Sequence, residues 1–216
     1  LTIVVKKRPE VPDRTTGGLD TVAVRLPDSQ VARDLISESL CPIAAPSANL
    51  SGRPSPTKAE HVIEDLSGRV EMIVDGGDSD IGLESSIIDL SGEVPMILRP
   101  GYITKEDFEQ IVEEVTFDAA VLATKPQESV VAKAPGMKYR HYAPKAPLVL
   151  VEGPAQQVIG KINALTAEGE AEGKKIGILA TEETKRYYSK GTVLCIGKRA
   201  DEESIARNLY ECLRRF

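Results

Sequence analysis

A stretch near the middle of the chain separates two parts that have regular patterns. Residues 116–147 show no sustained hydrophobic periodicity and contain four prolines: Pro126, Pro135, Pro144 and Pro147. A connection of this length without secondary structure of its own is usually functional or disordered. We therefore expect two domains, residues 1–115 and residues 148–216, joined by a linker.

The first part is typical of a mixed sheet with helices. Short runs rich in Val and Ile and bounded by Gly, Pro or Asp predict strands at residues 1–5, 21–26, 72–75, 86–90 and 95–98. Capping residues predict helices from Asp28 to about Leu40, from Thr57 (with Glu60) through Leu66, and from Thr104 (with Asp107) to near Val115. A turn at Ser91 and Gly92 predicts that the last two strands form a hairpin.

The second part alternates strands and helices at the spacing of a small parallel α/β domain. Strands are predicted at residues 148–152, 176–180 and 192–196, and helices at residues 155–166 and 203–216. This part has no GxGxxG motif, so the sequence gives no support for a dinucleotide site there.

The charge balance limits the partners that the chain can bind. Its net charge of -6 and pI near 5.2 argue against a protein that grips nucleic acid over its whole surface. Residues 133–147 are the local exception, because they carry four Lys or Arg residues and no carboxylate.

The cysteines and the hydropathy indicate the compartment. The three cysteines lie far apart without a CxxC pair, which is typical of free thiols in a reducing compartment. No apolar run reaches the roughly 18–20 residues that cross a bilayer, and no leader is recognised. We expect a cytoplasmic protein, and the abrupt start at Leu1 and end at Phe216 lead us to expect an internal fragment.

The first candidate binding segment is APSANLSGRPSPT, residues 45–57. Hydroxyl groups, an amide side chain and free backbone amides on a stiff, proline-containing loop suit a phosphate or carboxylate ligand. The alternative is an ordinary loop that leads into the helix predicted at Thr57, and composition alone favours this alternative.

The second candidate combines Ser85, Ser86 and Arg99. If the predicted hairpin pairs, Arg99 lies near both serines at one end of the sheet, where its guanidinium can fork onto a phosphate or carboxylate. An Arg that binds sheet-end carbonyls, or pairs with Glu84, is the alternative.

Other polar residues have weaker signals. Thr2 and Lys6 lie on one face of the first strand, where a solvated Lys is the ordinary interpretation. His61 lies within a predicted helix and is interpreted as structural, and a solvated linker residue is the default for His141. No Ser-His-Asp spacing, metal-ligand cluster or Walker loop is present in the sequence.

Together these segments resemble the threonylcarbamoyl-AMP synthase family in its two-domain form. The resemblance is carried by LTIVVK (1–6), GGLDTVAVRLP (17–27), APSANLSGRPSPT (45–57), LESSIIDL (83–90), ILRPG (97–101) and PGMKYRHYAP (135–144). It implies an α/β (α+β) fold in which a YrdC-like mixed sheet, a linker and a partial Rossmann-like domain follow one another.

The resemblance also implies an activity and its partners. A nucleotidyltransferase of this family converts L-threonine, bicarbonate and ATP, with Mg²⁺ as the expected metal ion, into threonylcarbamoyl-AMP and pyrophosphate. The product serves the threonylcarbamoyladenosine modification of tRNA through downstream threonylcarbamoyl transferase proteins, and direct tRNA contact stays open. The reactants carry negative charge, so the reaction needs positioned cations and donors more than a protein nucleophile.

Matching positions supply the site residues that the resemblance implies. ATP would contact Thr2, Ser47, Asn49, Ser55, Arg99 and His141, and threonine would contact Lys6, Ala45 and Ser85. Tyr139, Arg140 and Tyr142 would form a lid over ATP. The resemblance places the family's Lys-x-Arg motif, which helps to hold the ATP phosphates, in a segment before Leu1, so we expect the isolated 216 residues to be inactive.

Two other functions remain open from the sequence. The basic linker segment, with its tyrosines, also suits a non-catalytic RNA-binding module. A related carbamoyl-transfer enzyme of metal-centre maturation embeds a YrdC-like domain, but its expected zinc-finger cysteines are missing here.

Overall fold

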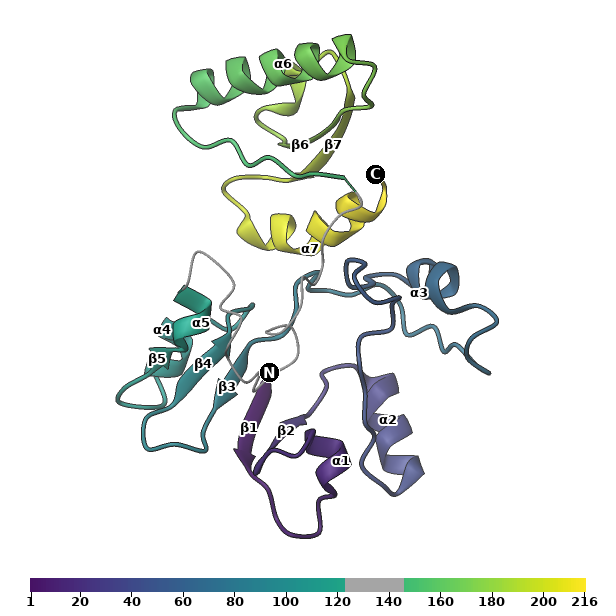
Figure 1. Ribbon diagram of the computed structural model, residues 1–216, viewed down its shortest axis with the longest axis vertical. Coiled ribbons are helices and arrows are strands. Elements are labelled where there is room, and N and C mark those ends of the chain that lie inside the picture. Colours follow the sequence, from purple (N-terminus) through teal and green to yellow (C-terminus); the bar gives the residue numbers. More distant parts are fainter. Residues whose placement is uncertain (123–145) are drawn as a thin grey trace. The chain divides into compact units, whose positions relative to one another are not determined.

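The computed structural model describes residues 1–122 and 146–216. They divide into two compact units, each described here by itself (Figure 1). Within the described ranges, the first unit comprises residues 1–47, 74–76 and 84–122, and the second comprises residues 48–73, 77–83 and 146–216.

The first unit is built on a five-stranded mixed sheet. In spatial order its strands are β2 (Thr21–Arg25), β1 (Thr2–Lys6), β3 (Ile87–Asp89), β4 (Met96–Arg99) and β5 (Thr116–Phe117). Strands β1 and β2, and β3 and β4, pair antiparallel, whereas β1 with β3 and β4 with β5 are parallel. The predicted hairpin is therefore confirmed.

Alternation along the strands gives each face of this sheet its own core. Val4, Ile87 and Leu98 form one buried cluster. Ile88, Ile97, Phe108 and Val115 form the other. Phe108 lies on α4 (Lys105–Glu109), so this short helix anchors the second cluster.

Local capping fixes the start of α4 as the sequence predicted. Thr104 Oγ1 accepts a hydrogen bond from the Asp107 amide at 3.3 Å, and Asp107 Oδ2 accepts one from the Thr104 amide at 2.9 Å. The helix ends at Glu109 and not near Val115, because Val115 turns into the core just before β5. The remaining helices of this unit are α1 (Asp13–Thr16), α2 (Gln30–Ser39) and α5 (Ala119–Leu122).

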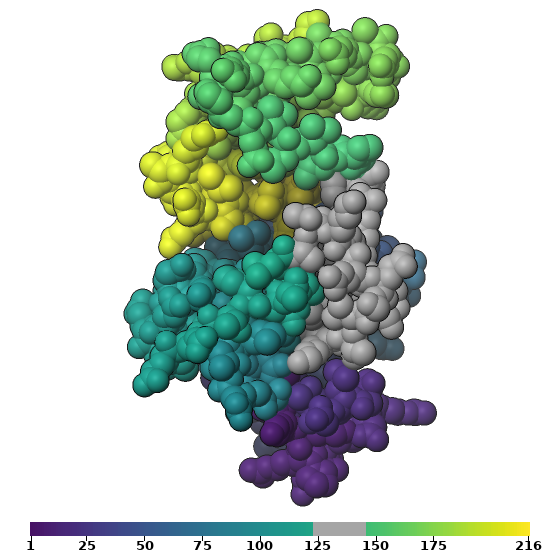
Figure 2. Space-filling model, turned by 60° about the vertical axis from the view of Figure 1, so that its left-hand side comes forward, coloured from purple at the N-terminus to yellow at the C-terminus, as the bar shows by residue number. Residues whose placement is uncertain are grey.

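The second unit contains a parallel pair of strands, β6 (Gly177–Thr181) and β7 (Thr192–Gly197). Helix α6 (Ala155–Ala171) packs on this pair through Ile159 and Ile162, and α7 (Glu202–Arg214) lies on the opposite side (Figure 1). The unit also contains α3 (Ala59–Leu66) and a 3-10 turn, η1 (Lys185–Tyr187). Figure 2 shows residues 146–216, in green and yellow, packed together as one body.

Four further local predictions are wrong: two concern strands and two concern the first residue of a helix. Residues 72–75 and 148–152 form no strand, since a strand needs a paired backbone and these apolar runs have none in the described chain. Thr57 forms no capping box, because α3 begins one residue later, with Lys58 at its N-cap. In place of Asp28, Ser29 caps α2.

No helix among the described residues is both long and apolar enough to cross a membrane.

Candidate functional site

Two arginines lie at the same end of the first sheet as Thr2. Thr2 pairs with Arg25 on one neighbouring strand and with Ile87 on the other, and Ile87 pairs with Arg99 on the next. The Arg25 Nε donates a hydrogen bond to Thr2 Oγ1 at 2.8 Å. We call Thr2, Arg25, Ser85 and Arg99 the sheet-end cluster.

Arg99 is held against the residue that the sequence placed beside it. Its Nε and Nη2 donate hydrogen bonds to the Ser85 carbonyl oxygen at 3.0 and 2.7 Å. This is the sheet-end carbonyl contact weighed as an alternative, and it also fixes the direction of the guanidinium. Ser86 has a structural contact instead. It is buried, and its Oγ donates a hydrogen bond to the Ile103 carbonyl oxygen at 2.7 Å.

Gly101 packs so tightly against Glu84 and Ser86, which flank Ser85 of the sheet-end cluster, that it tolerates no side chain. An added Cβ would lie 2.5 Å from the Glu84 carbonyl oxygen and 2.6 Å from the Ser86 nitrogen. Gly101→Ala is therefore expected to displace residues 84–86 and to lower the free energy of unfolding by about 1–3 kcal/mol. Urea denaturation measures this change.

Gly92→Ala is the matched control for Gly101→Ala. Gly92 is exposed in the β3–β4 loop, and its nearest atom to an added Cβ is 3.9 Å away. A Gly101→Ala protein as stable as Gly92→Ala would contradict the tight packing.

The structure does not bring Lys6, Ala45 or Ser47 into the sheet-end cluster. Lys6 is exposed at the other end of β1, opposite Thr21, about 13 Å of strand from Thr2. Ala45 and Ser47 lie in an exposed segment without regular structure after α2. Tyr139, Arg140, His141 and Tyr142 lie outside the described residues.

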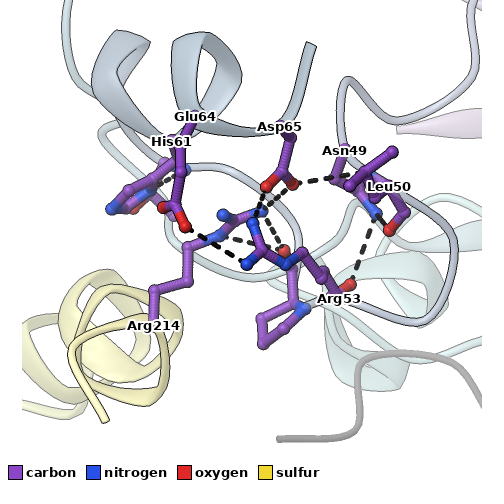
Figure 3. A network of polar contacts seen from close by, with 9 residues as sticks. Asn49, Leu50, Arg53, His61, Glu64, Asp65 and Arg214 are labelled. Carbon is purple, nitrogen blue, oxygen red and sulfur yellow. Dashed lines mark hydrogen bonds and ion pairs between the residues drawn. The ribbon is translucent and has the colours of Figure 1, made fainter. Parts of the chain in front are cut away.

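Two other candidate residues, Asn49 and Ser55, belong to the second unit. They lie in residues 49–57, which we call the Asn49 loop (Figure 3). The Asn49 Nδ2 donates to the carbonyl oxygens of Leu50 and Arg53 at 2.9 and 3.3 Å. Asn49 Oδ1 is buried and has no hydrogen-bond partner within the described ranges, and the same is true of Thr57 Oγ1. Ser55 lies half-buried between these two residues in the sequence.

A buried carboxylate anchors the Asn49 loop. The side chain of Asp65, on α3, is 0% exposed and accepts hydrogen bonds from Arg214 Nη2 at 2.9 Å and from the Leu50 amide at 3.2 Å. Arg53 forms an ion pair with the same carboxylate (Figure 3). Burial favours the protonated acid, but the hydrogen bonds from Arg214 and Arg53 outweigh it and lower the pKa of Asp65 from 3.8 to about 2.

His61 supports the end of the same loop. Its Nδ1 accepts a hydrogen bond from the Thr57 amide at 3.2 Å, which requires that nitrogen to be unprotonated. Burial lowers the pKa of His61, and the positive charge of Arg214 lowers it further. His61 therefore has a structural contact here.

The described residues contain no cluster of three or more His, Cys, Asp or Glu side chains that could hold a metal ion.

The sequence analysis did not identify four residues of these clusters: Arg25, Arg53, Asp65 and Arg214. Only Arg25 had a usable signal, because pairing β1 with β2 places it opposite Thr2.

Comparisons with known proteins cover the whole chain. A family model described as telomere recombination matches residues 1–101. A second model, described as the C-terminal domain of threonylcarbamoyl-AMP synthase, matches residues 103–216.

Individual relatives agree with these models. The chain is 48% identical over 214 residues to the threonylcarbamoyl-AMP synthase of Pyrococcus abyssi, covering 99% of the chain and 60% of that protein. The Bacillus subtilis protein of the same name is 46% identical over 217 residues, covering 100% of the chain and 60% of the relative. The chain thus spans about 60% of the length of these relatives.

A solved structure has the same fold. The crystal structure of P. abyssi Sua5 complexed with L-threonine superposes with a TM-score of 0.89 at 47% identity, over 99% of the chain and 60% of that structure. The expected combination of a mixed sheet with a small parallel α/β domain is therefore confirmed.

Proposed function

Because the chain belongs to the threonylcarbamoyl-AMP synthase family, we propose that the full-length protein makes threonylcarbamoyl-AMP from L-threonine, bicarbonate and ATP. The observation that carries this proposal is the identity of 46–48% to synthases of that name along 99–100% of the chain. The relative crystallised with L-threonine supports threonine as a substrate.

The proposed reaction forms two bonds and releases two products. The threonine amine bonds to the bicarbonate carbon with loss of water, which gives a carbamate. A carbamate oxygen then bonds to the α-phosphorus of ATP, and the bond to pyrophosphate breaks. Charge accumulates on phosphate and carboxylate oxygens throughout, so fixed cations and hydrogen-bond donors are the groups that such a site needs.

The two polar clusters offer groups of this kind. Arg25 and Arg99 supply positive charge at one end of the first sheet, and hydrogen bonds to Thr2 and Ser85 hold them in place. Asn49 Oδ1 and Thr57 Oγ1 are buried polar atoms that a ligand can satisfy.

We assign the pocket residues as the resemblance implies. ATP is assigned to Thr2, Ser47, Asn49, Ser55, Arg99 and His141, threonine to Lys6, Ala45 and Ser85, and the lid to Tyr139, Arg140 and Tyr142. A magnesium ion would arrive on the ATP phosphates, since Mg²⁺ commonly takes substrate phosphates and water as ligands. Downstream transferase proteins would then carry the threonylcarbamoyl group to tRNA.

Pyrophosphate release by the full-length protein tests the proposal. Release is expected only when ATP, L-threonine and bicarbonate are all present, because the carbamate must form before it can attack ATP. Release that needs a different amine would indicate another carbamoyl-transfer enzyme. Salt-dependent RNA binding without pyrophosphate release would instead indicate a binding module.

A further inference from the structure

Helix α7 contacts the segment that carries the Asn49 loop through one polar face. Arg207, Glu211 and Arg214 recur at the spacing that places side chains on one side of a helix. The Arg207 Nε donates to the Asp80 carbonyl at 2.9 Å, and Glu211 pairs with Lys58 Nζ at 3.0 Å. All of these residues belong to the second unit.

Close backbone packing fixes the helix at this position. An added Cβ on Gly82 would lie 2.6 Å from the Ala206 carbonyl oxygen and would overlap that of Arg207. Residue 82 therefore has to be glycine for α7 to come this near, and α7 has little freedom to shift along its contacts.

Arg214 makes the contacts that reach the loop itself. Its side chain is 4% exposed, and its Nε and Nη2 donate to the Pro54 carbonyl oxygen at 3.0 and 2.6 Å. The same Nη2 donates to Asp65 Oδ2 at 2.9 Å. Because Asp65 also binds Leu50 and Arg53, Arg214 and Asp65 together hold the Asn49 loop at three residues: Leu50, Arg53 and Pro54.

The Asn49 loop has a buried polar atom without a hydrogen-bond partner at each of its ends. Asn49 Oδ1 and Thr57 Oγ1 have no hydrogen bond within residues 1–122 and 146–216. A buried polar atom left unpaired costs about 1–3 kcal/mol, so a loop that keeps two of them is suited to a ligand that pairs with them. Their directions depend on the loop conformation, which Arg214 and Asp65 fix.

We infer that Arg214 is a positioning residue for ATP binding. Arg214 holds the Asn49 loop in the conformation that presents Asn49 to the nucleotide. This inference rests on the proposed function for the identity of the ligand. It gives α7 a part in substrate binding, because Arg214 positions the loop without touching the substrate itself.

Arg214→Ala in the full-length protein, with Arg207→Ala as its matched control, tests the inference. Arg207 lies on the same face of α7 and also donates to a backbone carbonyl, but that carbonyl belongs to Asp80, outside the Asn49 loop. The Kd for ATP, measured by calorimetry, is expected to rise about tenfold or more in Arg214→Ala and to change less than about twofold in Arg207→Ala. Hydrogen exchange should accelerate in residues 49–57 of Arg214→Ala alone.

Arg214→Lys is the second variant, in case Arg214→Ala does not fold. Lys keeps the charge beside Asp65 but cannot reproduce the forked contact with Pro54, so an intermediate ATP Kd is expected. An unchanged ATP Kd in both Arg214 variants, or faster loop exchange without weaker ATP binding, would overturn the inference. Wild-type protein that binds ATP but makes no threonylcarbamoyl-AMP would contradict the proposed function only, since the ATP Kd still decides the role of Arg214.

Discussion

Asp65→Ala is expected to lower the free energy of unfolding by about 3–5 kcal/mol, the loss typical when one partner of a buried ion pair is removed. Asp65 is buried between Arg53 and Arg214, so its loss removes the carboxylate that pairs with the buried Arg214 and one of the two that pair with Arg53. It also removes the acceptor of the Leu50 amide. Urea denaturation at neutral pH measures the change.

Glu64→Ala is the matched control, because Glu64 pairs with the same Arg53 at 3.1 Å from a side chain that is 58% exposed. Its loss should cost no more than about 1 kcal/mol. Equal stability of the two variants would contradict the anchoring role of Asp65.

Acid denaturation gives Asp65 a second signature. Its pKa is lowered on folding, so the unfolded state binds the proton first, and stability is lost as the pH falls from 3.8 toward 2. Asp65→Ala should lack this part of the pH dependence, whereas Glu64→Ala should keep it.

Asn49→Ala is expected to lower kcat/KM for ATP about a hundredfold, on the scale seen when a single positioned polar group is removed from an active site. The substitution removes Oδ1, the group proposed to meet the nucleotide, and also the two hydrogen bonds from Nδ2 that close the loop. Pyrophosphate release at varied ATP concentration measures the effect.

Ser51→Ala controls for general disturbance of the Asn49 loop, since Ser51 is exposed on the same loop. It should stay within about threefold of wild type, below the effect of losing a positioned group. An Asn49→Ala protein that folds and matches Ser51→Ala would remove Asn49 from the site.

The features that were predictable from sequence are local. The Thr104 capping box depends on two residues three positions apart, and the β3–β4 hairpin depends on a turn between adjacent strands. The predicted hairpin placed Arg99 near Ser85, and in the structure Arg99 donates a hydrogen bond to the Ser85 carbonyl oxygen. The strands predicted at residues 72–75 and 148–152 were wrong, because composition does not say whether a partner strand is present.

The anchor of the Asn49 loop was not predictable in this way. Arg214 and Asp65 are 149 residues apart in the sequence, and the residue pattern of a single helix does not predict a contact at that separation. An Asp in an amphipathic helix is ordinarily interpreted as exposed, and only the fold shows that Asp65 is buried and paired. The resemblance identified Asn49 but gave no account of how its loop is held.

Incorporation of labelled bicarbonate tests the central claim most directly. The full-length protein, incubated with ATP, L-threonine and ¹³C-bicarbonate, is predicted to form an adenylate that contains threonine and the labelled carbon, with one pyrophosphate released for each adenylate. Mass spectrometry of the quenched reaction identifies that product. Pyrophosphate release with an adenylate that lacks the labelled carbon, or no adenylate at all, would contradict the proposed synthesis of threonylcarbamoyl-AMP.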